Sequence, residues 1–279
     1  ASDVYKRQNM GSAGTATAAL GFGGRPPNTV ASNELYDGSS WTETGDLNTG
    51  RHSMASAGTS TSALSSGGEN TAIGREALKA NTTAHRSTAV GKNALNASHG
   101  NDNVAVGYEA LITNTTGTQN VSVGSYALDA NTTASSNVSV GYQALTANTT
   151  ANRNTALGRS ALATNTTGDD NVAVGYYALV NSTTSSDHTA VGNYALATNT
   201  TGESNTAIGL YALYDNSGGS YNTAIGINAL GDNTTASGNV AIGYNALRLN
   251  TTGTQSVAIG FQALDAVTTN SNNTAIGYN

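Results

Sequence analysis

Few residues of this chain have types and a spacing that could support chemistry. Its four histidines lie far apart without metal-ligand spacing, at His52, His85, His99 and His188. The one adjacent acidic pair, Asp169-Asp170, follows an Asn-Thr-Thr-Gly stretch that predicts a solvated loop rather than a catalytic dyad. No glycine-rich phrase continues into the lysine of a phosphate-binding loop. We therefore expect no catalytic residue, no metal site and no cofactor, and the sequence predicts a protein that is not an enzyme.

Aromatic residues provide the best candidate for a binding site. Tyr177, Tyr194 and Tyr211 occupy the same position, two residues after a glycine, in three successive repeats, and Tyr176 lies beside the first. If the repeats stack, these side chains form an aromatic column of the kind against which carbohydrates pack. The alternative is an aromatic ladder that only supports the stacking of the repeats. The predicted ligand-binding residues are Tyr176, Tyr177, Tyr194 and Tyr211.

Threonine-rich elements suggest two further kinds of site. Asn-Thr-Thr recurs in eight repeats and matches the N-glycosylation pattern, but its return at one structural position favours a role in a corner. Regular ranks of threonine can also order water, which makes an ice-binding solenoid an alternative function. Adjacent threonines of a strand point to opposite faces, however, whereas an ice-binding rank needs alternate positions on one face.

The composition is unlike that of an ordinary globular enzyme. Of the 279 residues, 10% are charged, whereas about 25% is typical, and 33 are glycine. The two prolines are compatible with long, regular backbone ladders, to which proline cannot donate. The net charge of −6 argues against nucleic acid as a partner. Cysteine is absent, so disulfides are excluded, and no apolar run is long enough for insertion into a membrane.

A strict internal repeat determines the fold class. The unit reads Asn-(Thr/Val)-Ala-(Ile/Val/Leu)-Gly-x-x-Ala-Leu-x-x-Asn-Thr-Thr-x-x-x, and its glycine recurs thirteen times. Eleven of the twelve intervals between these glycines are 17 residues and one, from Gly91 to Gly107, is 16. Seventeen residues cannot hold two helices and a turn, and the regularly placed large aliphatic residues argue against a disordered tract. The sequence therefore predicts a parallel β-solenoid of about twelve coils.

Each position of the unit has a structural interpretation. The aliphatic residue before glycine and the Thr or Val two residues earlier share one face of a strand, and the small residue between them points the other way. We expect the large residues inside, with a second short strand around Ala-Leu supplying another aliphatic anchor, and two rows of alanine on an outer face where subunits approach. Glycine is expected at one corner and Asn-Thr-Thr at another, with its side chains stacked in ladders. His188 occupies an asparagine position and is interpreted as a corner variant.

Residues 11–69 differ from the rest of the chain. The stretch at 13–24 recurs 44 residues later at 57–68, and between the two copies lie Tyr36-Asp37 and Trp41. A Gly-Gly pair, a Tyr-Asp and a following tryptophan resemble a kelch-type propeller blade, which has about 50 residues. The resemblance covers about one blade, and one blade cannot close a propeller. It implies either further blades upstream or an artificial junction between the two regions.

The phrase Thr-Ala-Ile-Gly-x-x-Ala-Leu resembles the heads of trimeric autotransporter adhesins, and its 17-residue form with Asn-Thr-Thr is similar to repeats of phage tail fibres. The resemblance covers residues 70–279 and implies a left-handed parallel β-roll in a homotrimer. The chain departs from the adhesin heads in its longer period and in its Asn-Thr-Thr corner. The resemblance therefore leaves a phage and a bacterial origin open.

Together these features predict an all-β chain in three parts: a leader at 1–10, a kelch-like β-blade fragment at 11–69 and a β-solenoid repeat domain at 70–279. The leader resembles translated adaptor sequence from metagenomic reads and the last repeat is cut short, so we expect a fragment of a longer protein. Twelve coils at about 4.8 Å each predict a rod of roughly 55–60 Å. The predicted function is an extracellular, cell-surface or virion fibre or adhesin shaft, homotrimeric, with a glycan or receptor as partner. The alternatives are an ice-binding solenoid and a passive spacer without ligand.

Overall fold

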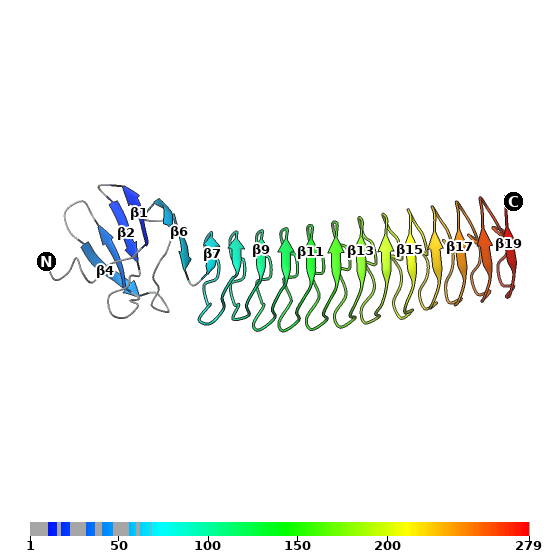
Figure 1. Ribbon diagram of the computed structural model, residues 1–279, viewed down its shortest axis with the longest axis horizontal. Helices are drawn as coiled ribbons and strands as arrows, with labels where there is room; N and C mark the ends of the chain where they lie inside the picture. Colours follow the sequence, from blue (N-terminus) through cyan, green and yellow to red (C-terminus); the bar gives the residue numbers. More distant parts are fainter. Residues whose placement is uncertain are drawn as a thin grey trace.

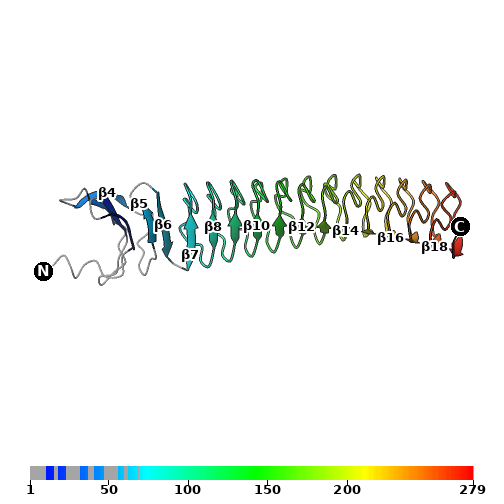
Figure 2. The ribbon, with the colours of Figure 1, turned by 90° about the horizontal axis from the view of Figure 1, so that it is seen from above.

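The computed structural model describes residues 11–15, 18–22, 32–36, 41–46, 56–59, 62–67 and 69–278, with side chains from residue 69 onward. Every regular element that it describes is a β-strand. Thirteen of these strands, β7 to β19, lie side by side in one row along the long axis (Figure 1). Between successive strands the chain loops around as one coil of a continuous stack (Figure 2). The predicted parallel β-solenoid is thereby confirmed.

The strands before the solenoid form two groups. A four-stranded antiparallel sheet contains β1 (Gly11–Thr15), β2 (Ala18–Phe22), β3 (Ser32–Tyr36) and β4 (Trp41–Asp46). The hairpin of β5 (Ser56–Thr59) and β6 (Ser62–Gly67) follows, and β6 pairs antiparallel with the first solenoid strand. The kelch-like identity of this region stays a prediction, and the expected leader at 1–10 lies outside the described residues.

The solenoid strands each contain three or four residues and pair in register, so that equivalent residues of successive coils lie opposite one another. In chain order they are β7 (Asn70–Ile73), β8 (Thr88–Val90), β9 (Val104–Val106), β10 (Val121–Val123), β11 (Val138–Val140), β12 (Thr155–Leu157), β13 (Val172–Val174), β14 (Thr189–Val191), β15 (Thr206–Ile208), β16 (Thr223–Ile225), β17 (Val240–Ile242), β18 (Val257–Ile259) and β19 (Thr274–Ile276).

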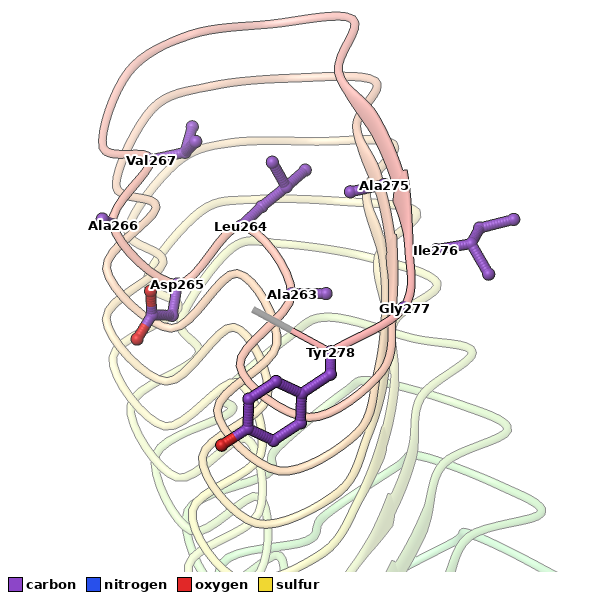
Figure 3. Close-up of a pocket in the computed structure, with 9 residues that line it drawn as sticks. All are labelled: Ala263, Leu264, Asp265, Ala266, Val267, Ala275, Ile276, Gly277 and Tyr278. Atoms are coloured by element: carbon purple, nitrogen blue, oxygen red, sulfur yellow. The ribbon is translucent and has the colours of Figure 1, made fainter.

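The strands face the opposite way from the expectation. Their central alanines point into the coil and are fully buried, as at Ala173, Ala190 and Ala207, whereas Leu157 is 46% exposed and Ile208 is 38% exposed. At the last coil Ala275 points inward and Ile276 points away from the coil (Figure 3). The prediction of large aliphatic residues inside and alanine outside is therefore wrong. The reason is the width of the coil, because its interior already holds a leucine and a second alanine from the opposite wall.

The opposite wall carries the Ala-Leu pair, which is turn rather than the predicted second strand. Its leucine is the expected anchor: Leu128, Leu145 and Leu162, for example, are fully buried. These leucines adopt left-handed backbone conformations, as at Leu128 with a φ of 51°. The wall is nevertheless joined from coil to coil, since the Leu128 N–H donates to the carbonyl of Ala144 at 3.0 Å.

Glycine forms the corner after each strand, as predicted. Gly141 has a φ of 140°, in a region that side chains disfavour, and a Cβ placed on it would lie 2.4 Å from the carbonyl oxygen of Gly158. The corner therefore requires glycine both for its backbone angle and for the close approach of the next coil.

Two ladders of buried asparagine side chains run along the corners of the stack. In the first, Asn120 donates its side-chain amide to Asn103 Oδ1 at 3.2 Å and to the carbonyl of Ala134 at 2.8 Å. In the second, which belongs to Asn-Thr-Thr, Asn131 donates to Asn114 Oδ1 at 2.8 Å and to the same carbonyl of Ala134 at 3.1 Å. The predicted ladder of Asn-Thr-Thr side chains is confirmed. The first ladder was not predicted, because its asparagine directly precedes the strand and was read as part of the strand phrase.

The 16-residue interval is accommodated at the same corner. Ser98-His99-Gly100 stands where other coils have Asn-Thr-Thr and a fourth residue, so one residue is missing there. The strand pairing is unaffected, because Thr88 still lies opposite Val104. The exposed corner thus absorbs a change in length that the strands cannot.

Replacing one ladder residue tests its contribution to stability. Asn131→Ala is expected to cost about 1–3 kcal/mol, because the Oδ1 of Asn114 and the carbonyl of Ala134 stay buried and lose a donor. The measurement is the urea midpoint of the full chain, followed by circular dichroism. Thr133→Ala, at an exposed position two residues away, is the control and is expected to leave the midpoint unchanged. Equal midpoints for both variants would contradict a structural role of the ladder.

Candidate binding surfaces of the solenoid

The outward residues of the thirteen strands form a continuous surface, here called the outer sheet face. It contains two ranks, one of Thr or Val and one of Ile, Val or Leu, and none of its 26 residues is charged. The first rank is Thr71, Thr88, Val104, Val121, Val138, Thr155, Val172, Thr189, Thr206, Thr223, Val240, Val257 and Thr274. The second rank is Ile73, Val90, Val106, Val123, Val140, Leu157, Val174, Val191, Ile208, Ile225, Ile242, Ile259 and Ile276.

The area of the outer sheet face lies at the upper end of the range for apolar patches in contact with water. Strands of about 10 Å, repeated over roughly 58 Å, give an area of about 600 Å². The largest apolar patch of a typical monomer is about 300–600 Å², and such patches are often functional. In the second rank, Leu157 is 46% exposed although equivalent residues flank it in both neighbouring coils, and Ile276 of the last coil is 75% exposed. The face is therefore the largest candidate interaction surface of the solenoid.

The four predicted ligand-binding tyrosines come together in the structure. The rings of Tyr177 and Tyr194 stack with centroids 5.6 Å apart, and those of Tyr194 and Tyr211 stack at 5.5 Å. The ring of Tyr176 lies edge-on to this stack, 4.4 Å from Tyr177 and 5.4 Å from Tyr194. The predicted column thus exists as a geometric feature, while its binding function stays a prediction.

A fifth tyrosine, which the sequence analysis missed, completes this group. Tyr214 lies edge-on at the other side of the stack, 5.2 Å from Tyr211 and 6.2 Å from Tyr194. Its position three residues after Tyr211, across the Ala-Leu turn, is the signal that could have identified it. Desolvation within the group, together with a hydrogen bond to Tyr176, raises the pKa of Tyr194.

The histidines of the described region do not form a site. His99 Nδ1 lies 3.3 Å from the hydroxyl of Thr82 in an exposed corner, and His52 lies outside the described residues. His188 is buried in the first asparagine ladder, where its Nδ1 accepts from the N–H of Asn205 at 3.2 Å. The backbone N–H of His188 in turn donates to Asn171 Oδ1 at 3.1 Å. The interpretation of His188 as a corner variant is confirmed.

The acidic pair is engaged in surface hydrogen bonds. Asp170 accepts two hydrogen bonds from the guanidinium of Arg153, at 2.6 and 2.7 Å, and this partner lowers the pKa of Asp170. Asp169 accepts from the backbone N–H of Asn152 at 2.6 Å. The two carboxylates therefore hold successive corners together, as expected of a solvated loop.

The asparagines of Asn-Thr-Thr are unavailable on the folded surface. Asn114, Asn131 and Asn148, for example, are fully buried, and each side-chain amide donates within the ladder or to a backbone carbonyl. The threonine hydroxyls extend the pattern, since Thr132 Oγ1 donates to the carbonyl of Thr149 at 3.1 Å. These contacts support the interpretation of the element as corner chemistry.

A hollow of about 420 Å³ lies at the C-terminal end of the stack (Figure 3). It is lined by core residues of the last coil, including Leu264, Val267 and Ala275, so it is the axial end of the core rather than a separate site. Within residues 69–278, no group of three or more His, Asp or Glu side chains could hold a metal ion. None of the described residues belongs to a helix that could cross a membrane.

The buried imidazole of His188 makes stability depend on pH. Burial lowers the pKa of His188 from 6.5 to about 4, so the unfolded chain binds a proton in this range that the folded chain does not. Stability is therefore expected to fall by up to about 3 kcal/mol as pH drops from about 6.5 to about 4, and this contribution is constant below that range. The measurement is the urea midpoint at a series of pH values.

His188→Asn is the matched control, because asparagine occupies this position in ten of the thirteen copies. The difference in midpoint between the two proteins isolates the histidine from the carboxylates, which titrate in both. A difference that does not change between pH 7 and pH 4 would contradict the buried, neutral imidazole.

No protein-family model matches the chain, and neither does any curated protein or any solved structure. The described part of the solenoid carries two candidate binding surfaces, the outer sheet face and the cluster of five tyrosines.

Proposed function

We propose that this chain is the shaft of an extracellular or virion fibre or adhesin, in which copies of the chain associate as a homotrimer through the outer sheet face. The observation that carries the proposal is the unbroken, uncharged double rank of outward Thr, Val, Ile and Leu residues along all thirteen strands. A catalytic step is no part of the proposed function.

A second copy of the same chain is the occupant that this face fits best. The outer sheet face repeats the same chemistry at every coil, so a parallel copy would meet apolar side chains at each level. Its area of about 600 Å² approaches the roughly 800 Å² that each partner contributes to a standard interface. At about 25 cal/mol per Å², burying 600 Å² corresponds to about 15 kcal/mol before the costs of association. The resemblance to trimeric adhesin heads favours three copies.

A column beside the second rank would widen such an interface toward the C-terminal end. The residue after each corner glycine is exposed and apolar in the last five coils, at Leu210, Ile227, Tyr244, Phe261 and Tyr278. In the first two coils the same position holds Arg75 and Lys92. In parallel copies the same basic residue of each chain would lie at the same height, and their repulsion disfavours close approach. We therefore expect the chains to touch along this column mainly in the C-terminal half.

Ice binding is the second candidate, and one observation favours it. The outer sheet face presents its residues at alternate strand positions on one face, which is the arrangement that the Asn-Thr-Thr threonines lack. Threonine fills only seven of the thirteen positions of the first rank and none of the second, however. An array this rich in Val and Ile is better suited to burial than to ordering water.

Charged substitutions on the outer sheet face test the proposal. In Val140→Lys, Val174→Lys, each copy would bury two unpaired charges, so the full chain is expected to change from three times the monomer mass to the monomer mass. The measurement is light scattering coupled to size exclusion, with circular dichroism on the same samples to verify that the β spectrum is retained.

Thr133→Lys, Thr150→Lys is the matched control, because both threonines are exposed at the Asn-Thr-Thr corner. This control is expected to keep the trimer mass. A parent chain that is monomeric at micromolar concentration would refute the trimeric shaft. Thermal hysteresis from such a monomer, abolished by the two lysines on the outer face, would establish the ice-binding alternative.

A further inference from the structure

Five tyrosines from three successive coils form one aromatic surface, here called the tyrosine group. It comprises the stack of Tyr177, Tyr194 and Tyr211 and the edge-on rings of Tyr176 and Tyr214. The stack spaces its rings by about one coil, so that the group extends along the axis over three coils. Tyr176 and Tyr211 are each 37% exposed, which leaves ring surface in contact with water.

The backbone two residues after the corner glycine does not require tyrosine. Tyr177, Tyr194 and Tyr211 have φ values of 55°, 56° and 57°, in the left-handed region where a bulky residue is unusual. The same position holds asparagine at Asn228 and Asn245, which tolerates this conformation better. Other coils hold Glu109 and Gln143 at this position, so the coil accepts several residue types there and does not depend on tyrosine.

The surroundings of the tyrosine group hold few charges, and one of them is the guanidinium of Arg159 in the preceding coil, 5.8 Å from the ring centroid of Tyr176. In its three coils, the positions one, two, five and six residues after the corner glycine hold twelve residues, of which only Asp215 is charged. Two exposed side-chain amides, of Asn181 and Asn193, accompany the rings. Rings with phenol hydroxyls, beside amides and without a cationic cluster, suit a ligand that combines apolar C–H faces with neutral hydroxyls.

Among the described residues, no other aromatic group combines a face-to-face stack with edge-on rings, since Tyr108, Tyr126 and Tyr142 meet one another only edge-on. Tyr244, Phe261 and Tyr278 stack at 5.1 and 5.2 Å, but no edge-on ring lies beside them among the described residues. Tyr108 lies 5.0 Å from the Lys92 ammonium, and a hydrogen bond with the neighbouring Glu109 contributes most to raising its pKa to about 12.

From these observations we infer that the tyrosine group is a binding site for neutral oligosaccharides, with Tyr177, Tyr194 and Tyr211 as its floor and Tyr176 and Tyr214 as its sides. The site deepens the proposed function, since it rests on the shaft being an attachment protein and names the class of ligand. The outer ring edges and the free ring faces at both ends of the stack contact the C–H faces of the sugars, while Asn181, Asn193 and the phenol hydroxyls bond to sugar hydroxyls.

Asparagine substitutions in the full chain test the site. The probes are cellotetraose, chitotetraose and mannotetraose, with polysialic acid as the acidic counter-probe, and binding is measured by titration calorimetry. The parent chain is expected to bind at least one neutral probe saturably and polysialic acid not at all. Tyr177→Asn, Tyr194→Asn, Tyr211→Asn is expected to weaken that binding at least about tenfold, while asparagine at this position keeps the coil intact.

Tyr126→Asn is the control, because it makes the same substitution at the same position of the unit in a coil outside the group, and it is expected to leave binding within about twofold of the parent. Absence of saturable binding to every neutral probe, binding to polysialic acid alone, or equal binding by the triple variant would each overturn the site.

The solution mass of the same samples separates this inference from the proposed function. A trimer without glycan binding would remove the tyrosine site and leave the shaft standing. A monomer that binds a neutral glycan through the tyrosines would refute the trimeric shaft and leave the site standing.

Discussion

The hydrogen bonds between stacked asparagine side chains are the interaction on which the rest of this structure depends. Each of these side chains binds a carbonyl at the corner and a group of the neighbouring coil: Asn131 donates to Ala134 and Asn114, and Asn205 donates to Gly219 and accepts from the backbone N–H of Asn222. A buried amide without partners is costly, so every coil must return its asparagine to the same place above the last. This requirement explains the strict period and the in-register strands. The outer sheet face and the tyrosine group are both consequences of the register.

The thin interior of the coil explains which side chains face outward. A coil of 17 residues encloses room for one leucine and two alanines per level, so the β-branched residues of each strand have no place inside. The buried leucine has a left-handed backbone conformation, which destabilises the fold by about 1–2 kcal/mol. Burial of its side chain stabilises the fold by about 1.5–3 kcal/mol, which offsets this strain. Where serine replaces the inward alanine, at Ser122, its hydroxyl donates to the carbonyl of Ala127 at 2.7 Å. The strand side of the core thus accepts small residues only, and the large apolar side chains of the strands lie on the surface.

The repeat period, the glycine corner and the Asn-Thr-Thr ladder could be predicted from the sequence, because each depends on a residue type with few alternative roles. Which face of each strand points into the coil could not be predicted. In Val172–Val174 all three residues are apolar, so alternation shows which residues share a face but not which face is inside. The second predicted strand was wrong for a related reason, since nothing in Ala-Leu indicates a leucine with a positive φ. The tyrosine stack followed from its spacing, whereas Tyr214 occupies a different position of the unit and meets the stack only through the turn.

Disulfide formation between introduced cysteines tests the stacking register and the outward face together. Because the chain has no cysteine of its own, a disulfide can form only between the introduced residues. In Val172→Cys, Thr189→Cys the two residues are direct partners on neighbouring strands, at a spacing of about 4.8 Å that a disulfide can span. This pair is predicted to close within one chain on mild oxidation, as read from the mass of the denatured, alkylated protein. In Val172→Cys, Ala190→Cys the second cysteine points into the coil, and this pair is predicted to stay reduced. Closure of the offset pair, or of neither pair, would contradict the in-register coil from which both surfaces are derived.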